Sequence, residues 1–467
     1  MQQSLIEKKA LLKKYDVAGP RYTSYPPATQ FNAEFKERDY LTALAPHTQQ
    51  AEPLSLYLHL PFCQSICYYC ACNKIVTKDR SVVRKYLDYL HKEMALMRFQ
   101  LGVDNRPVTQ LHWGGGTPTF LDVAEMTELM HVTAKFFNLI SDDYRDYSIE
   151  LDPRTVGNEE LDLLRGLGFN RLSIGVQDFN ADVQAAINRM QSYDSIARLV
   201  EHIRARGFRS LNFDLIYGLP NQTLKTLAET LALVLQLSPD RISFYNYAHM
   251  PDRFKSQRAI DRLQLPSAET KVELLNLIIN TLVDAGYEYI GLDHFVKSSD
   301  SLAQAREKGK LTRNFQGYSI ALAKDLVGIG VSSISSFDQV YVQNQRDLEK
   351  YYQLLDLNQL PIEQGLTLSY DDLLRREVIQ QLSCYRCIDI DAFEQKYEID
   401  FAQHFSSELQ NLLPFVNDGI VEQDSCSIVI TEKGYPFLRN VCMTFDAYLG
   451  TPKTLPTGER FRYSKTL

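Results

Sequence analysis

Apolar residues recur in two alternating patterns from residue 54 to about residue 292. Short apolar runs of strand length are followed by longer segments with the spacing of amphipathic helices. We expect strands at residues 54–60, 108–113, 147–151, 171–176, 211–216 and 241–247. We expect helices at residues 80–99, 121–138, 158–167, 192–206, 222–237 and 267–285. Six consecutive strand–helix units predict an α/β fold with a parallel sheet, a partial (β/α)6 barrel, and a seventh strand at 287–292 extends its edge.

The segments on either side of this pattern are different. Residues 1–50 begin with a charged helical stretch at 4–15, and the prolines of residues 19–27 exclude a long helix there. We expect an ordered arm, which either covers a ligand or only packs on a domain. Helical patterns after residue 345, with a short hairpin near residues 419–431, predict a mainly helical C-terminal domain. The predicted division is therefore 1–50, 51–344 and 345–467.

Polar and glycine residues gather where the predicted strands end. They are the cysteine loop, Gly114 to Gly116, Glu150, Asp152, Gln177, Asp178, Asp214 and Asn246 to His249. Ligands of parallel α/β folds bind at the carboxyl ends of the strands. The sequence therefore predicts one ligand site at this end of the sheet.

Four of the eight cysteines fall within ten residues. Cys63, Cys67 and Cys70 have the spacing C-x3-C-x2-C, and Cys72 follows. Thiolates select zinc, copper(I) or iron–sulfur clusters. A closed zinc site usually takes two C-x2-C-like halves, and no second half lies nearby. We favour a cubane-type cluster with one iron left open for a small molecule, and a zinc knuckle is the alternative.

The other motifs are weaker on their own. Gly114-Gly115-Gly116-Thr117-Pro118 matches neither nucleotide-phosphate pattern, so it is either a close approach of backbone to a ligand or a tight turn. Cys384, Cys387, Cys426 and Cys442 are expected to be buried or incidental thiols, because no paired C-x2-C partner exists.

Charge and hydropathy exclude several classes of protein. The net charge is −8 with acids and bases interspersed, which argues against binding to nucleic acid or to an anionic membrane. No apolar stretch approaches ~18 residues, so no membrane span is expected. The first residues lack the apolar core of a signal peptide. We expect a cytoplasmic protein.

With both loops in place, the sequence resembles the radical S-adenosylmethionine (SAM) superfamily and, within it, the family of oxygen-independent coproporphyrinogen III oxidases. The matching segments are 19–26, 57–63, 112–119, 175–180, 214–220 and 313–318. The cysteine loop is typical of the superfamily, whereas the arm and the Arg313 segment are specific to the oxidases. Ala71 stands where glycine is commoner, and residues 319–324 depart from the family's pattern, which leaves the surroundings of Ile334 less defined.

The resemblance implies roles for individual residues. Cys63, Cys67 and Cys70 are expected to hold a [4Fe–4S] cluster, and Cys72, Tyr57 and His59 are expected to serve catalysis. A first SAM on the open iron is expected at Tyr57, Tyr69 (through its backbone), Gly115, Glu150 and Ile334. A second SAM is expected at Gly116, Thr117, Gln177, Arg189, Asp214 and Ala248.

The implied reaction converts two propionates of coproporphyrinogen III to vinyl groups and gives protoporphyrinogen IX in haem biosynthesis. A propionate C–H bond is unactivated, so a cofactor must supply the reactive group. The resemblance implies that a reduced cluster cleaves SAM, and that the resulting 5′-deoxyadenosyl radical takes a hydrogen from the propionate β-carbon. Loss of CO2 and one electron follows. A reductant such as flavodoxin or ferredoxin is the implied partner, and we expect a monomer.

The substrate carries four carboxylates although the chain is acidic. We therefore predict a local basic pocket drawn from His59, Lys74, Arg21 and Arg313. Two other classes of protein stay open: a haem-binding chaperone of the same superfamily branch, and a structural zinc protein. Such chaperones typically lack the arm motif and the fourth cysteine, and both are present here.

Overall fold

The computed structural model describes residues 10–11, 13–44, 52–101, 106–449 and 463–465. Its centre is one large sheet whose strands follow the order β10-β11-β9-β8-β7-β6-β4-β1-β14-β15-β16-β17. The strands from β9 to β14 in this order are parallel to one another. They are β1 (Leu54–Leu60), β4 (Pro107–Gly115), β6 (Asp146–Leu151), β7 (Arg171–Gln177), β8 (Ser210–Tyr217), β9 (Arg241–Asn246) and β14 (Asp325–Ile329). The six predicted strands are confirmed, and β14 adds a parallel neighbour of β1.

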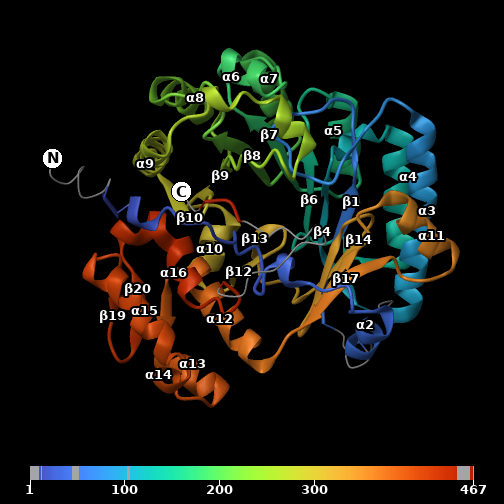
Figure 1. Cartoon of the computed structure of the whole chain (residues 1–467). Coiled ribbons are helices and arrows are strands. Elements are labelled where there is room, and N and C mark those ends of the chain that lie inside the picture. Colours follow the sequence, from blue (N-terminus) through green and yellow to red (C-terminus); the bar gives the residue numbers. More distant parts are fainter. Residues whose placement is uncertain (1–9, 12, 45–51, 102–105, 450–462, 466–467) are drawn as a thin grey trace.

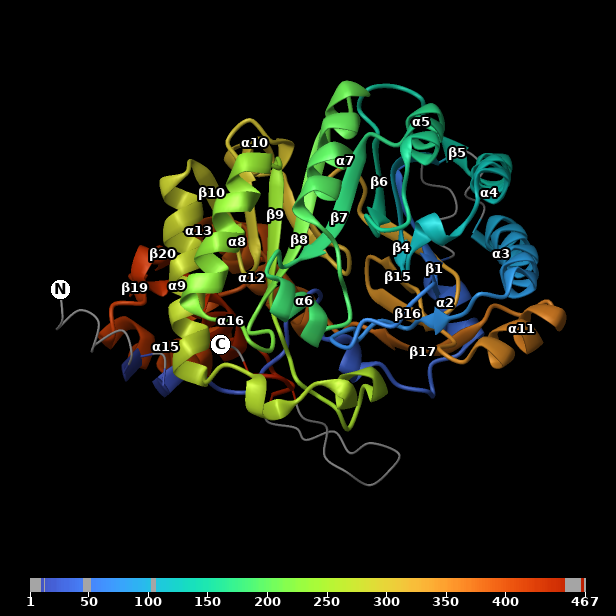
Figure 2. The ribbon, with the colours of Figure 1, turned by 90° about the horizontal axis from the view of Figure 1, so that it is seen from above.

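The predicted helices are confirmed on the outer side of these strands (Figure 2). They are α3 (Arg80–Leu101), α4 (Val123–Phe136), α5 (Asn158–Gly166), α7 (Tyr193–Ala205), α8 (Leu224–Leu237) and α9 (Ala268–Asp284), with a short α6 (Ala181–Ala186) before α7. Their apolar faces and the outward residues of the strands form the largest core, which includes the buried Trp113. Burial of this apolar surface is the main force that holds the helices on the sheet.

Side-chain caps begin these helices where the sequence has short polar residues. Asp122 accepts a hydrogen bond from the backbone of Glu125, whose side chain accepts one from Asp122 N, so α4 starts with a capping box. Ser192 and Ser267 cap α7 and α9, and each hydroxyl accepts one backbone hydrogen bond. The caps satisfy backbone donors that a helix start leaves unpaired.

Both edges of the sheet are antiparallel. At one edge β10 (Tyr287–Gly291) pairs with β11 (His294–Lys297), and β11 lies between β10 and β9. At the other edge are β15 (Ile334–Phe337), β16 (Val340–Asn344) and β17 (Ile362–Thr367). The predicted division at residue 345 therefore falls inside this sheet, because α11 (Leu348–Asp356) and β17 follow it. We propose a boundary near residue 368 instead.

Short elements connect or flank the large sheet. They are η1 (Ala28–Gln30), α2 (Glu37–Leu44), β2 (Phe62–Cys63), β3 (Ile75–Val76), η4 (Pro118–Phe120), β5 (Asn138–Leu139), η5 (Lys255–Ala259), η6 (Arg262–Gln264), α10 (Ser301–Glu307), β12 (Leu311–Asn314) and β13 (Gly317–Ile320). β12 and β13 form a hairpin apart from the large sheet, and it carries the Arg313 segment. No helix among the described residues is long and apolar enough to cross a membrane.

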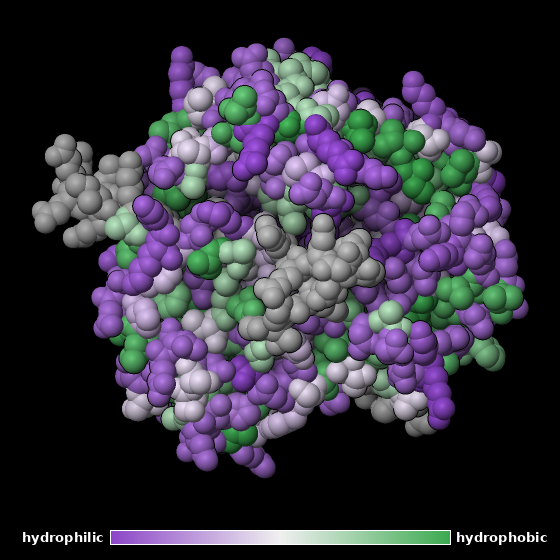
Figure 3. Space-filling model, in the orientation of Figure 1, coloured by the Kyte–Doolittle hydropathy of each residue, from purple (hydrophilic) through white to green (hydrophobic). Residues whose placement is uncertain are grey.

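The C-terminal region is a helical domain beside the barrel (Figure 1). It contains α12 (Tyr370–Tyr385), α13 (Ile390–Tyr397), α14 (Phe401–His404), α15 (Ser406–Asn417), η7 (Glu432–Phe437) and α16 (Leu438–Thr444), with β18 (Cys387–Asp389), β19 (Val421–Gln423) and β20 (Ser427–Ile430). Its core includes four residues of the N-terminal arm: Leu11, Tyr15, Tyr22 and Tyr25. The arm is therefore part of this domain's packing. Arg21, which directly precedes Tyr22, is exposed. Hydrophilic residues dominate the face shown in Figure 3, with smaller apolar patches among them.

A buried ion pair connects the start of β4 to the start of β14. Arg106 donates to Asp325 Oδ2 at 2.7 Å and to Glu52 O at 2.7 Å, and both charged side chains are buried. Arg106→Met removes the buried guanidinium that pairs with the Asp325 carboxylate, so we expect the free energy of unfolding to fall by roughly 3–5 kcal/mol. Urea unfolding measures this loss. The double variant Arg106→Met/Asp325→Leu should recover much of it, and a double variant as unstable as the single one contradicts the reading.

Candidate active site

A cavity of about 630 Å³ opens between the carboxyl ends of the parallel strands and continues between their inward side chains. Twelve of the sixteen predicted site residues line it: Cys63, Cys67, Tyr69, Cys70, Cys72, Gly115, Gly116, Thr117, Glu150, Gln177, Arg189 and Asp214. Tyr57, His59, Ala248 and Ile334 are not among its lining residues. The cavity brings together the cysteine loop, the glycine loop and polar strand ends that are far apart in the sequence.

The cysteine loop is held in place by its backbone. Tyr68 N donates to Ile187 O at 3.0 Å, and Asn188 Nδ2 donates to Ile66 O at 2.7 Å. The Gln257 amide donates to Tyr69 O at 3.0 Å, and Ser256 Oγ donates to Cys70 O at 2.8 Å. These bonds come from α6 and η5, so neighbouring strand ends orient the sulfur atoms.

Hydrogen-bond donors and cations surround the sulfur atoms. The guanidinium of Arg189 lies 3.5 Å from Cys67 Sγ, and Thr117 Oγ1 lies 3.6 Å from Cys63 Sγ. The Cys72 thiol lowers the pKa of Cys70 to about 6 by hydrogen bonding, and Lys74 adds to this against the effect of burial. Burial raises the pKa of Cys63 to about 11. The donors favour thiolates and would also favour an anionic group bound to them.

The donor set fits a multi-iron cluster better than a single ion. All eight cysteines are free. Among the described residues, no three His, Cys, Asp or Glu side chains converge as ligands of one metal ion. Each thiolate of an iron–sulfur cubane binds a different iron atom, so the sulfurs need not converge. Three thiols in one loop are therefore compatible with such a cluster.

The glycine loop needs glycine because it contacts the segment that leads into the cysteine loop. A Cβ atom on Gly116 would lie 2.6 Å from the Pro61 carbonyl, and one on Gly115 would lie 2.6 Å from the His59 ring. Gly115 also has φ +111°, which other residues rarely adopt. The backbone N–H of Gly116 donates to Leu60 O at 2.8 Å. The triple glycine therefore joins β1 to β4 closely at the cavity.

Below the glycine loop, two histidines connect a tyrosine and a carboxylate. His59 Nε2 lies 3.0 Å from the carbonyl oxygen of Asn73, which only accepts, so Nε2 carries the proton. His59 Nδ1 then accepts from the Tyr57 hydroxyl at 3.0 Å. Burial lowers the pKa of His59, which favours this neutral form. Tyr57 stacks on His112 with 5.8 Å between ring centroids.

Glu150 is oriented by two donors. Its Oε2 accepts from Gly115 N at 3.2 Å, and its Oε1 lies 3.3 Å from His112 Nε2. Burial acts to raise the pKa of Glu150, but the hydrogen bond from His112 and its charge outweigh burial and lower the pKa. The carboxylate is therefore held ionised against the cavity. Sequence reasoning did not single out His112 as a site residue, although it points inward on β4, two residues before Gly114.

A second charged group lies beside Cys67. Arg189 donates to Asp152 Oδ2 at 3.1 Å and to Gly175 O at 2.7 Å, and Arg154 donates to the same Asp152 oxygen at 2.6 Å.

Gln177 at the end of β7 has φ +67°, an unusual conformation for a residue with a side chain. Arg154 was not predicted, and only its position three residues after the end of β6 pointed to it.

Asp214 is a buried carboxylate in the wall of the cavity. It accepts from Ser173 Oγ at 2.6 Å and from Asn212 Nδ2 at 3.0 Å, and burial raises its pKa from 3.8 to about 6. The folded protein therefore binds this proton more tightly than the unfolded chain, so stability falls as pH rises from about 4 to 6. A buried carboxylate with a raised pKa in a cavity wall is a candidate binding group for a cationic ligand.

Asp214→Asn tests the cost of ionising this buried carboxylate in protein without cofactors. We expect the variant to be more stable than the parent protein at pH 7, by about 1–2 kcal/mol, because it removes a poorly solvated charge. The gain should shrink below pH 4, where Asp214 is protonated in both states. Thermal unfolding from pH 3.5 to 7.5 measures it, and a gain that does not change with pH contradicts the argument.

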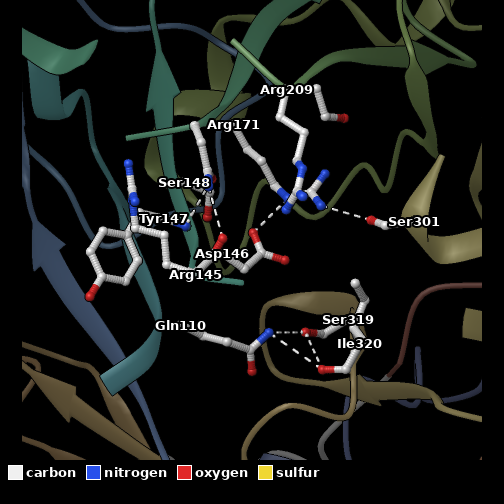
Figure 4. A network of polar contacts seen from close by, with 12 residues as sticks. Gln110, Arg145, Asp146, Tyr147, Ser148, Arg171, Arg209, Ser301, Ser319 and Ile320 are labelled. Carbon is white, nitrogen blue, oxygen red and sulfur yellow. Dashed lines mark hydrogen bonds and ion pairs between the residues drawn. The ribbon is translucent and has the colours of Figure 1, made fainter. Parts of the chain in front are cut away.

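Ion pairs close the amino end of the cavity (Figure 4). Arg171 pairs with Asp146 at 2.7 Å and donates to Ser301 Oγ at 2.7 Å, while Arg241 pairs with Asp300 at 3.0 Å. Gln110 donates to Ser319 Oγ at 2.7 Å across the same floor. The inner residues are thus polar along the whole depth of the cavity, unlike the apolar layers that fill a closed barrel.

The four residues of the predicted basic pocket have separate surroundings. Lys74 donates to Cys70 O at 3.1 Å, and His59 is held by Tyr57 and Asn73. Arg313 donates to Tyr22 O at 3.1 Å and lies over the Tyr318 ring. Arg21 donates to Asn246 O at 2.6 Å. Only Arg21 offers a guanidinium at the outer rim of the site.

Comparisons with known proteins agree with this arrangement. The family model of the radical SAM superfamily matches residues 57–234, and that of the HemN C-terminal domain matches residues 368–437. The chain is 47% identical over 440 residues to an oxygen-independent coproporphyrinogen III oxidase of Salmonella typhimurium, covering 94% of this chain and 95% of that protein. It is 46% identical over 457 residues to the Pseudomonas aeruginosa protein of the same name, with 98% of each chain covered.

A solved structure extends the likeness to three dimensions. The coproporphyrinogen III oxidase (HemN) of Escherichia coli, described as a radical SAM enzyme, superposes with a TM-score of 0.89 at 44% identity. The superposition covers 94% of this chain and 99% of that one. The radical SAM resemblance and the α/β fold predicted from the sequence are confirmed. The chain belongs to the family of oxygen-independent coproporphyrinogen III oxidases within the radical SAM superfamily.

Proposed function

We propose that this chain catalyses the oxygen-independent oxidative decarboxylation of two propionate side chains of coproporphyrinogen III, which gives protoporphyrinogen IX. The observation that carries the proposal is the single cavity into which a three-cysteine loop, the glycine loop, Glu150, Arg189 and Asp214 all open. The family relation over nearly the whole chain supports an oxidase over a haem-binding chaperone. Each propionate loses one hydrogen atom, one electron and CO2 to become a vinyl group.

Enzymes of this superfamily use a [4Fe–4S] cluster and SAM, which together supply a carbon radical able to take hydrogen from an unactivated C–H bond. We propose that Cys63, Cys67 and Cys70 hold the cluster, and that Arg189, Arg154 and Thr117 stabilise the negative charge on their sulfurs. Cys72 lines the cavity beside Cys70 without being needed as a ligand. We assign it a catalytic role, together with Tyr57 and His59.

The inward carboxylates are suited to SAM, which carries an amino group, a sulfonium and ribose hydroxyls. We propose Glu150 for the first SAM, with Tyr57, Tyr69, Gly115 and Ile334 around it. We propose Asp214 and Arg189 for a second SAM, with Gly116, Thr117, Gln177 and Ala248. Asp214 offers an acceptor and Arg189 a donor, so this pair can bind both charged ends of an amino acid.

The deep polar cavity and the arm restrict access of water to the reacting atoms. Tyr25, Tyr22 and Tyr341 join the arm to the C-terminal domain and to the antiparallel edge of the sheet: Tyr341 donates to Tyr25 O at 3.0 Å, and Tyr22 donates to Asp446 at 2.8 Å. We propose that the arm covers bound substrate from this position. We also propose a flavodoxin or ferredoxin as reductant, a monomeric state and a cytoplasmic location.

Anaerobic turnover tests the function. Reconstituted protein is mixed with coproporphyrinogen III, SAM and a reductant under argon, and the oxidised porphyrin product is followed by fluorescence. We expect protoporphyrin, with methionine and 5′-deoxyadenosine formed in parallel. Tight binding of haem without any conversion of coproporphyrinogen III would instead support the chaperone.

A further inference from the structure

Three cations gather at the ends of β8 and β9, and their hydrogen bonds go to uncharged oxygens. Arg21 of the arm donates to Asn246 O at 2.6 Å, and Lys271 of α9 donates to Tyr247 O at 2.9 Å and to Asn246 Oδ1 at 3.3 Å. Arg439 of α16 donates to the backbone oxygens of Gly19, Pro20 and Lys465. Every acceptor is a neutral oxygen. None of the three cations forms an ion pair within the described part of the chain.

These like charges are close enough to oppose one another. Burial, against the opposing charge of Asp16 and together with the charges of Arg21 and Lys465, lowers the pKa of Lys271 to about 8. Burial also lowers the pKa of Arg439 to about 10, again with Arg21. The acids that face them are Asp16, which already pairs with Lys465 at 2.5 Å, and Asp293. Positive charge is therefore in excess, and partly buried charge without a counter-ion is costly unless a ligand supplies one.

A small cavity of about 40 Å³ lies among these groups. Arg21, Arg439, Asn246, Asp293, Tyr217 and Tyr435 are among the residues that line it. The volume exceeds what one water molecule needs, so a carboxylate group can fit. Planar guanidinium groups bind carboxylates with paired hydrogen bonds, which makes this chemistry the natural match.

The small cavity lies at the same strand ends as the active-site cavity. Ile216 and Tyr245 line the active-site cavity, and the residues that follow them, Tyr217 and Asn246, line the small one from the other face of the sheet. Lys271 is bonded to Tyr247, directly before Ala248, for which we propose a contact with SAM. A ligand that fills the active site and projects acidic arms would bring a carboxylate near this rim.

We propose that Arg21, Lys271 and Arg439 form a carboxylate-binding site at the rim, which anchors a propionate of the porphyrinogen that does not react. The inference rests on the proposed function for its ligand. The three residues come from the arm, the barrel and the C-terminal domain, so substrate binding draws these parts together. This set replaces the predicted pocket of Arg21, Arg313, Lys74 and His59.

Binding of coproporphyrin III, the oxidised four-carboxylate analogue, tests the site without turnover. The full chain is titrated anaerobically and the fluorescence of the porphyrin is followed. We expect the double variant Arg21→Gln/Lys271→Gln to raise Kd by roughly 10- to 100-fold. Lys14→Gln, which removes an arm cation paired with Asp418, is the matched control and should bind as the parent protein does. Lys271→Arg should restore most of the affinity lost in Lys271→Gln.

Two further binding measurements identify the source of the carboxylate. Mesoporphyrin keeps only the two propionates that do not react, so it should lose as much affinity as coproporphyrin III in the double variant; a clearly smaller loss would assign the site to a reacting propionate and overturn the proposal. Acetate should compete weakly with coproporphyrin III in the parent protein; strong competition at low concentration would assign the site to a free anion and overturn the propionate assignment. Affinity should also fall as pH rises past about 8 in the parent protein but not in Lys271→Arg, because the ammonium loses its charge.

The inference and the function fail in different ways. Wild-type affinity for coproporphyrin III in a folded double variant overturns the rim site even if the parent enzyme turns over substrate. A parent protein that binds the porphyrin but converts no coproporphyrinogen III overturns the function and leaves the rim site standing. Circular dichroism and thermal unfolding show whether each variant is folded.

Discussion

We expect that replacing Cys63, Cys67 or Cys70 with serine abolishes both iron binding and turnover. The three sulfurs belong to one loop whose backbone is fixed by Gln257 and Ser256, and a serine hydroxyl is a much poorer ligand for iron than a thiolate. Iron analysis after anaerobic reconstitution should fall from about four atoms per chain to near zero. Turnover should fall to background, because the cofactor supplies the reactive group and the protein cannot replace it.

Two other cysteines serve as controls for this result. Cys426→Ser changes an exposed thiol of the C-terminal domain and should leave iron content and turnover unchanged. Cys72→Ser should keep the iron but lose activity, because Cys72 lines the cavity without completing the three-cysteine set. Full iron content in Cys67→Ser, or loss of iron in Cys72→Ser, would show that the ligands are assigned wrongly.

The strands and helices that enclose the cavity could be predicted because their signals are local. Each unit combines an apolar strand with an amphipathic helix directly after it, and parallel pairing with right-handed crossovers then follows from general rules. The polar residues at the strand ends fall on one side for the same reason. Residues such as Glu150 and Asp214 could therefore be assigned to one site before any contact was known.

The antiparallel edges and the ion pairs could not be predicted because their partners are remote or their strands short. β11 has four residues and inserts between β10 and β9 through a tight hairpin, so the predicted edge strand does not contact its expected neighbour. β17 joins the sheet after α11, which made its segment look like part of the helical domain. Arg171 points inward on a predicted strand, but nothing local in the sequence indicates its pairing with Asp146.

The same limit applies to the basic pocket. Arg313 and Lys74 are cations in or near the motif segments, but each donates a hydrogen bond to a nearby carbonyl oxygen. Lys271 and Arg439 carry no motif, and only the packing of α9 and α16 against the arm brings them to Arg21. A sequence shows which charges exist, whereas the folded chain decides which of them remain without a counter-ion.

Glu150→Gln should weaken SAM binding by roughly 10- to 100-fold while iron content stays normal. The carboxylate is held ionised and aimed into the cavity by Gly115 N and His112, so its charge is available to the amino group or ribose of SAM. Hydrogen bonds that involve a charged group contribute about 1.5–3 kcal/mol, which corresponds to this change in affinity. Equilibrium binding of SAM to the reconstituted enzyme measures the change.

Glutamine keeps the shape of the side chain and can still accept from Gly115 N, so the loss reports the charge and not a collapsed loop. Glu159→Gln on the exposed start of α5 is the matched control and should bind SAM as the parent enzyme does. Unchanged SAM affinity in Glu150→Gln would mean that Glu150 only braces the glycine loop, and that another carboxylate, with Asp214 the first candidate, binds the amino group.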